Sequence, residues 1–159
     1  KTGVHTVLFY GERNNPNIKL VNIKFKSEIA NLLEHSKAYE AILVNQDNYV
    51  TEGSRSNLFF IKADTLYTSP LKDVLPGVTR TNIINVCNDL GIPLKEQAIA
   101  VNELTSFDAI FMTGTSPKLL PISLVNDMIF SSAENSLLKQ ITNEFNKYIY
   151  KYIESKKIE

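Results

Sequence analysis

The sequence has no tryptophan, one cysteine and two histidines among its 159 residues. A lone cysteine, Cys87, excludes an internal disulfide, and so few histidine and cysteine side chains predict no zinc or other metal site. Apolar runs such as residues 41–44 fall far short of the ~20 residues that a membrane-spanning helix needs. No signal-peptide pattern opens the sequence. These absences favour a cytoplasmic protein that binds neither a metal nor a membrane.

The sequence also lacks an excess of charge of one sign, because 17 basic side chains balance 17 acidic ones. Proteins that bind nucleic acid usually carry a basic excess concentrated on one face, so nucleic acid is not expected as a partner. No low-complexity run, internal repeat or linker interrupts the chain. Its length and its hydrophobic content of 43% predict a single domain over residues 1–159.

Hydrophobic periodicity predicts a strand-rich α/β (α+β) domain with peripheral helices. A long final helix is expected from Ser132, with an apolar side formed by Leu137, Ile141, Phe145, Tyr148 and Tyr152. The second to fifth predicted strands are expected to form a meander. The predicted strands are residues 4–10, 41–44, 49–51, 57–62, 65–68, 93–98, 109–113 and 119–125, and the other predicted helices are residues 22–36, 79–90 and 103–107.

Four short segments combine turn residues with polar groups at the ends of predicted elements. Taken singly, each has a structural explanation, because the glycines permit tight turns and a loop lysine is commonly solvated. Together they bring a lysine, an acid and several hydroxyl groups to the ends of predicted elements. They are Asn17-Ile18-Lys19, Glu52-Gly53-Ser54-Arg55-Ser56-Asn57, Leu75-Pro76-Gly77-Val78-Thr79-Arg80 and Thr113-Gly114-Thr115-Ser116-Pro117.

The third segment leads directly into the predicted helix 79–90. Backbone N–H groups near Val78 and Thr79 would therefore be unpaired donors at a helix N-terminus, where the dipole favours an anion, and Thr79 adds a hydroxyl. The fourth segment supplies a second hydroxyl loop around Gly114. Neither segment matches the longer glycine patterns of nucleotide-binding loops. The two loops predict a ligand that carries phosphate and need not be a nucleotide.

Glu52 allows two interpretations at this stage. It could form a structural ion bridge with Arg55 or Arg80, the commoner fate of such a residue. Alternatively, its carboxylate could keep the ring nitrogen of a pyridine cofactor protonated, so that the ring withdraws electrons from the substrate. That chemistry requires a lysine with a nucleophilic amine. Lys19 is the candidate, although spacing alone does not separate it from the nearby lysines 24 and 26.

In this order, the four segments resemble the large-domain signature of the class IV aminotransferases, the fold-type IV pyridoxal-phosphate enzymes. This family includes branched-chain aminotransferase, D-amino-acid aminotransferase and aminodeoxychorismate lyase. The resemblance runs from Ile18 to about Val125 and implies a barrel-like, strand-rich domain. Its strongest parts are Tyr39-Glu40-Ala41-Ile42-Leu43, Thr51-Glu52-Gly53-Ser54, Ser56-Asn57-Leu58-Phe59, Leu75-Pro76-Gly77-Val78-Thr79-Arg80 and Phe111-Met112-Thr113-Gly114-Thr115-Ser116.

The resemblance implies pyridoxal 5'-phosphate as cofactor and a role for each matched residue. Lys19 corresponds to the lysine that bonds to the cofactor and moves the substrate proton, and Glu52 to the partner of the pyridine nitrogen. A larger set surrounds the rest of the cofactor. In it Leu75 packs on the ring, Val78, Thr79, Gly114 and Thr115 hold the phosphate, and Ser116 approaches the substrate carboxylate.

The resemblance also implies amino transfer between an amino acid and a 2-oxo acid, of the branched-chain or D-amino-acid type, in a homodimer. Aminodeoxychorismate lyase is the alternative, because it begins with removal of the same α-proton. The family's smaller N-terminal domain, which reads the substrate side chain, does not precede Lys1 in this sequence. A third possibility is therefore a catalytically incomplete piece that only folds and associates.

Overall fold

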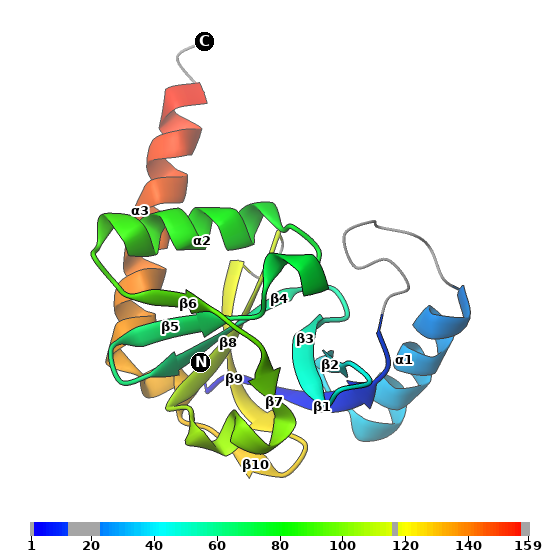
Figure 1. Cartoon of the computed structure of the whole chain (residues 1–159). Coiled ribbons are helices and arrows are strands. Elements are labelled where there is room, and N and C mark those ends of the chain that lie inside the picture. Colours follow the sequence, from blue (N-terminus) through cyan, green and yellow to red (C-terminus); the bar gives the residue numbers. More distant parts are fainter. Residues whose placement is uncertain (1, 13–22, 116–117, 157–159) are drawn as a thin grey trace.

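The computed structural model describes residues 2–12, 23–115 and 118–156. Ten strands in these ranges form one curled sheet, in which β10 pairs with β9 beside the order β6-β5-β4-β8-β9-β1-β2-β3-β7 (Figure 1). The predicted strand-rich fold is confirmed. The strands are β1 (Val4–Tyr10), β2 (Glu40–Val44), β3 (Tyr49–Gly53), β4 (Asn57–Lys62), β5 (Thr65–Thr68), β6 (Leu94–Glu96), β7 (Ile99–Ala100), β8 (Ala109–Gly114), β9 (Lys118–Val125) and β10 (Met128–Ile129).

Side chains of the central strand β4 alternate between two hydrophobic cores. Leu58 and Phe60 lie in a core that includes residues of β2, β3, β8 and β9, inside the curl of the sheet. Phe59 and Ile61 point to the opposite face, where they pack with residues of α2 (Val78–Asp89). Successive side chains of a strand point to opposite faces, so a continuous apolar run serves both cores.

Three helices lie on the outside of the curled sheet (Figure 1). The helices α2 and α3 (Ser136–Lys156) share one core with the outward side chains of β4 and β8. The helix α1 (Ile23–Ser36) buries Ile29 in a smaller core with Ala41 and Leu43 of β2. These contacts fix the start of α2 above the ends of β4 and β8, which positions the candidate site.

The prediction of a four-stranded meander is wrong, because β3 does not pair with β4. Instead β2–β3 and β4–β5 are two antiparallel hairpins, and the three strands β8, β9 and β1 lie between them in the sheet order. The turn Gly53 to Ser56 carries the chain across the curl, with the Gly53 N–H donating to the Ser56 carbonyl at 2.8 Å. The Ser69 hydroxyl, just after β5, donates to the Val50 carbonyl of β3 at 2.8 Å. The curl therefore brings the two hairpins together without strand pairing.

Several predicted boundaries also change. Residues 93–98 form only the short strand β6, the separate strand β7 follows, and the expected helix at 103–107 is a 3-10 helix at Val101–Ser106. The α3 helix begins at Ser136, because the Asn135 side-chain oxygen accepts the Leu138 N–H at 3.0 Å. Ser132, where the helix was expected to begin, is buried and accepts the Ile110 N–H at 2.9 Å.

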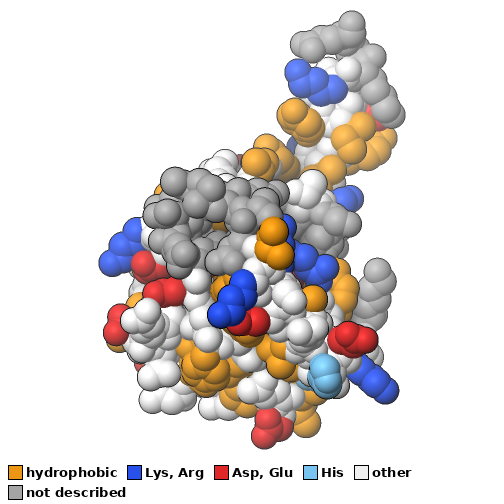
Figure 2. Space-filling model, turned by 90° about the vertical axis from the view of Figure 1, so that its right-hand side faces the viewer, with side chains coloured by type: hydrophobic (Ala, Val, Ile, Leu, Met, Phe, Trp, Pro, Cys, Tyr) orange, Lys and Arg blue, Asp and Glu red, His pale blue; other side chains and the backbone are white. Residues whose placement is uncertain are grey.

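The apolar side of α3 is only partly buried. Ile141 and Phe145 pack in the core, as the periodicity predicts, together with Leu138. The later side chains Tyr148 and Tyr152 are 40% and 57% exposed, because this end of α3 projects beyond the sheet (Figure 1). Hydrophobic side chains are visible on the projecting end in Figure 2. The apolar side predicted for α3 is therefore longer than the part of the molecule that covers it.

None of the helices within the described ranges combines the length and apolar character needed to cross a membrane. Within the same ranges, no three His, Cys, Asp or Glu side chains gather as a metal site would require.

Candidate active site

A cavity of about 310 Å³ lies where the turn after β3, the start of α2 and the end of β8 meet. Three of the four segments singled out in the sequence contribute to its wall. The described lining residues are Lys26, Glu52, Ser54, Arg55, Ser56, Asn57, Leu75, Gly77, Val78, Thr79, Thr113, Gly114 and Thr115.

Glu52, at the end of β3, is the acidic residue among those that line the cavity. It is 3% exposed, and its Oε2 accepts the Leu75 N–H at 3.0 Å. The two arginines considered as structural partners pair with other carboxylates, Arg55 with Glu40 at 3.6 Å and Arg80 with Glu96 at 3.1 Å. Glu52 thus lines the cavity beside the loop that leads into α2, and its role there stays a prediction.

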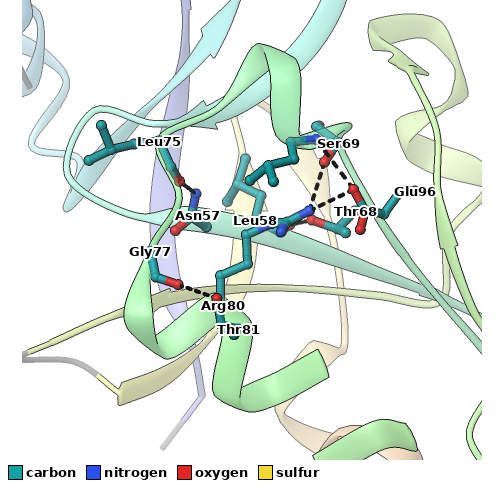
Figure 3. Close-up of polar contacts among 10 residues, drawn as sticks. Asn57, Leu58, Thr68, Ser69, Leu75, Gly77, Arg80, Thr81 and Glu96 are labelled. Atoms are coloured by element: carbon teal, nitrogen blue, oxygen red, sulfur yellow. Dashed lines mark hydrogen bonds and ion pairs between the residues drawn. The ribbon is translucent and has the colours of Figure 1, made fainter. Parts of the chain in front are cut away.

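The Leu75 backbone is held on both sides by residues of β3 and β4 that flank the turn between these strands. Its N–H donates to Glu52, and its carbonyl accepts the Asn57 Nδ2–H at 2.9 Å (Figure 3). The same Asn57 side chain lies against Gly77, where an added Cβ would come within 2.2 Å of Asn57 Oδ1. Asn57 thus fixes the loop that leads into α2 and requires glycine at its last position.

The start of α2 lies at the cavity. Gly77 caps the helix with an extended backbone (φ −78°, ψ 135°), and no side chain caps the helix in the described residues. The Gly77 carbonyl accepts the Thr81 N–H at 3.0 Å. It also accepts the Thr81 hydroxyl at 3.2 Å (Figure 3). No acidic side chain occupies the first turn. A helix N-terminus of this kind favours an anion.

Arg80 lies in this first turn but points away from the helix start. It is 3% exposed, and its guanidinium donates to the Ser69 carbonyl at 3.2 Å and pairs with Glu96 at 3.1 Å (Figure 3). Arg80 therefore anchors α2 to the chain after β5. An anion at this end would meet backbone N–H groups and hydroxyls instead of the Arg80 guanidinium.

The end of β8 faces the start of α2. Thr113 pairs across the strands with Asn57, and Gly114 and Thr115 follow at the cavity. Thr113 is 1% exposed, whereas Thr115 is exposed. Hydroxyls from β8 and from Thr79 of α2 thus approach the same cavity from two elements.

The structure brings together six of the eight predicted site residues, Glu52, Leu75, Val78, Thr79, Gly114 and Thr115. The other two, Lys19 and Ser116, lie outside the described residues. Among the alternative lysines, Lys26 lines the cavity, whereas the Lys24 amine is exposed and lies 4.0 Å from Glu28. The roles of all eight residues remain predictions.

Asn57 and Thr113 also belong to this wall. Both lie in two of the four segments singled out in the sequence, but neither was given a role there. The alternation of side chains along each strand could have indicated both residues. Asn57 shares a face of the sheet with Phe59, and Thr113 shares the same face with Phe111, the face that α2 covers. Their pairing across strands then places both beneath the start of that helix.

These groups fit a ligand with an anionic end, a flat apolar body and a basic ring atom. Open N–H groups and hydroxyls suit the anion, the half-buried Leu75 offers an apolar contact, and the Glu52 carboxylate suits a protonated nitrogen.

The chain is similar to known aminotransferases. The family model described as "Amino-transferase class IV" matches residues 2–125. The D-alanine aminotransferase of Bacillus licheniformis is 32% identical over 126 residues, which are 78% of this chain and 44% of that protein. The branched-chain-amino-acid aminotransferase of Escherichia coli K12 is 36% identical over 88 residues, which are 55% of this chain and 28% of that protein.

Solved structures of other proteins have a similar fold. The branched-chain aminotransferase of Thermoproteus uzoniensis, solved with norvaline, has a TM-score of 0.82 at 29% identity, covering 91% of this chain and 50% of that one. A Legionella pneumophila protein provisionally named 4-amino-4-deoxychorismate lyase has a TM-score of 0.85 at 25% identity, covering 92% and 56%.

The chain therefore belongs to the class IV aminotransferase family. It spans less than half the length of the two curated relatives named above.

Proposed function

We propose that the chain binds pyridoxal 5'-phosphate and carries out amino transfer between an amino acid and a 2-oxo acid. The observation that carries the proposal is the convergence of a buried carboxylate, Glu52, and an uncapped helix N-terminus on one cavity. When bound, pyridoxal phosphate supplies an aldehyde carbon that reacts with amines and a pyridine ring that withdraws electrons.

Different residues of the cavity bind different parts of this cofactor. The N–H groups of Val78 and Thr79 and the hydroxyls of Thr79 and Thr115 bind the phosphate, with Gly114 beside them. Leu75 packs on the ring. Glu52 holds a proton at the ring nitrogen, and its bond from the Leu75 N–H keeps the carboxylate oriented.

Lys19 is proposed to hold the cofactor covalently and to move the proton of the substrate α-carbon through its Nζ. Ser116 is proposed to approach the substrate carboxylate. These two assignments rest on the sequence resemblance.

The relatives support amino transfer more than elimination, since the two curated relatives are named as aminotransferases of D-alanine and of branched-chain amino acids. The similarity to the Legionella pneumophila structure favours a lyase as second candidate. Under that reading the same residues remove the α-proton, and pyruvate is released instead of a 2-oxo acid formed by amino transfer.

The remaining expectations belong to the same proposal. The chain would form the cofactor-binding part of a two-domain subunit, assemble as a homodimer and act in the cytoplasm. Light scattering during size-exclusion chromatography tests the dimer, with a mass of about twice 17.9 kDa expected.

The cofactor assignment is tested by adding pyridoxal phosphate, reducing with borohydride and locating the labelled lysine by peptide mass spectrometry. We expect the label on Lys19 and its loss in Lys19→Ala. Label on Lys26 with Lys19 unmodified would overturn the assignment, since Lys26 also lines the cavity. Lys24→Ala, an exposed lysine change, is the matched control and should leave labelling unchanged.

The reaction is then tested in the loaded protein with D-alanine, leucine and aminodeoxychorismate, each with 2-oxoglutarate. Glutamate production supports amino transfer. Pyruvate from aminodeoxychorismate without glutamate supports the lyase.

A further inference from the structure

Thr113 carries a buried hydroxyl that the assignments above leave unused. The residue is 1% exposed, lines the cavity, and its Oγ1 has no hydrogen-bond partner in the described part of the chain. Burying a hydroxyl without a partner destabilises the folded state. Such a group in a native fold calls for an explanation.

The direction of the Thr113 side chain follows from the alternation of side chains along β8. In β8, Ala109 and Phe111 pack in the core that α2 covers, whereas Ile110 and Met112 face the inside of the curl. Thr113 continues the first series, so its side chain points to the face under α2.

The neighbouring strand confirms which end of α2 is involved. On this face Phe59 pairs with Phe111, and one step further Asn57 pairs with Thr113. The Asn57 side chain in turn lies against Gly77, the residue that caps α2. The apolar face thus becomes polar at one place, directly beneath the uncapped start of the helix.

We propose that Thr113 is a further phosphate-binding residue, whose hydroxyl donates to the phosphate held at the start of α2. This inference rests on the proposed function. Thr79 lines the cavity from α2 and Thr115 from the position after β8, whereas Thr113 lines it from within β8. The phosphate oxygens would satisfy the hydroxyl that the described residues leave unpaired.

The test compares the dissociation constants of pyridoxal phosphate and of pyridoxal, which lacks the phosphate, in wild type and variants. Thr113→Val removes the hydroxyl at nearly constant volume. A hydrogen bond to a charged group is worth about 1.5–3 kcal/mol, so we expect affinity for pyridoxal phosphate to fall about tenfold to a hundredfold. Affinity for pyridoxal should stay within about twofold.

A second readout needs no cofactor. Because Thr113→Val removes an unpaired buried hydroxyl, the melting temperature of the cofactor-free protein should rise, by about 2–4 °C for each kcal/mol. Higher stability together with weaker phosphate binding is a combination that a merely structural threonine would not give.

Thr81→Val is the matched control. The Thr81 hydroxyl lies on the same first turn of α2 but is exposed and donates to the Gly77 carbonyl at 3.2 Å. This variant should bind pyridoxal phosphate like the wild type. If Thr113→Val does not fold, the pair Thr113→Ser and Thr113→Ala isolates the hydroxyl, and only Thr113→Ala should lose affinity.

Unchanged affinity of Thr113→Val for pyridoxal phosphate would overturn the inference, as would an equal loss of affinity for pyridoxal. If the wild type itself binds no pyridoxal phosphate, the proposed function fails, and the inference fails with it. The two failures are therefore distinguishable.

Discussion

The Oε2 atom of Glu52 accepts a hydrogen bond of 3.0 Å from the backbone N–H of Leu75. This bond joins the end of β3 to the loop that begins α2, so it connects the acid proposed for the ring nitrogen with the loop proposed for the phosphate. The Asn57 side chain holds the other side of the same residue, through the Leu75 carbonyl. A displacement at either end would therefore reach the other.

Glu52→Gln should separate cofactor binding from catalysis. Glutamine keeps an oxygen that can accept the Leu75 N–H, so affinity for pyridoxal phosphate should change by less than about threefold. The amide cannot hold the ring nitrogen protonated, so exchange of the substrate α-proton with deuterium, followed by NMR in the loaded protein, should slow by about 10²–10⁴-fold. An exchange rate equal to that of the wild type would argue against the role of Glu52.

Gly77→Ala should destabilise the loop before α2. The backbone of Gly77 suits any residue (φ −78°), but the added Cβ would lie 2.2 Å from Asn57 Oδ1. Such overpacking costs about 1–3 kcal/mol, measurable by urea denaturation.

The double variant Gly77→Ala/Asn57→Ala is the control for this explanation. Without the asparagine side chain the clash is removed, so the loss of stability should be smaller than the sum of the two single losses. Additive losses would show that the clash is not the cause.

Asn135→Ala should shorten or weaken α3, because the Asn135 side chain accepts the Leu138 N–H at the start of this helix. Loss of an N-cap costs about 0.5–2 kcal/mol, and a decrease in melting temperature of about 2–4 °C per kcal/mol is expected. The exposed mid-helix variant Asn143→Ala should cause no decrease. Equal melting temperatures of Asn135→Ala and wild type would contradict the capping role.

Cys87 should make stability fall in alkaline solution. Burial raises the pKa of its thiol from 9.0 to about 12. Below pH 9 the thiol is protonated in both states, so its contribution is complete. Between pH 9 and 12 only the unfolded chain releases the proton, and stability decreases by about 1.4 kcal/mol per pH unit.

The measurement is the free energy of unfolding of wild type and Cys87→Ala from pH 8 to 10.5. The difference between the two proteins should be constant up to about pH 9 and should then move against the wild type. A difference that does not vary with pH would contradict the buried thiol. A thiol reagent at pH 8 should label Cys87 only after unfolding.

Much of this fold follows from local periodicity. The strands β1, β4 and β5 begin and end as the sequence predicts, because apolar runs bounded by turn residues define them. The pairing of β3 and β4 could not be predicted, because it depends on a curl built from contacts between distant strands. The exposed Tyr152 shows a related difficulty, since periodicity defines a helix face but not how far the rest of the molecule extends along it.

The candidate site divides in the same way. Glu52 and Thr79 could be chosen from the sequence because each lies beside a glycine-containing turn and has a side chain suited to cofactor binding. Asn57 and Thr113 belong to two of the four segments, but only the register between β4 and β8 brings them beneath α2. Strand register is set by long-range pairing, which a local pattern does not contain.

A crystal structure of the protein with pyridoxal phosphate tests the central claim most directly. We expect the phosphate at the N–H groups of Val78 and Thr79, with the Thr113 hydroxyl beneath it, and the ring nitrogen within hydrogen-bond distance of Glu52. A cofactor bound away from the start of α2, or a ring nitrogen distant from Glu52, would contradict the account.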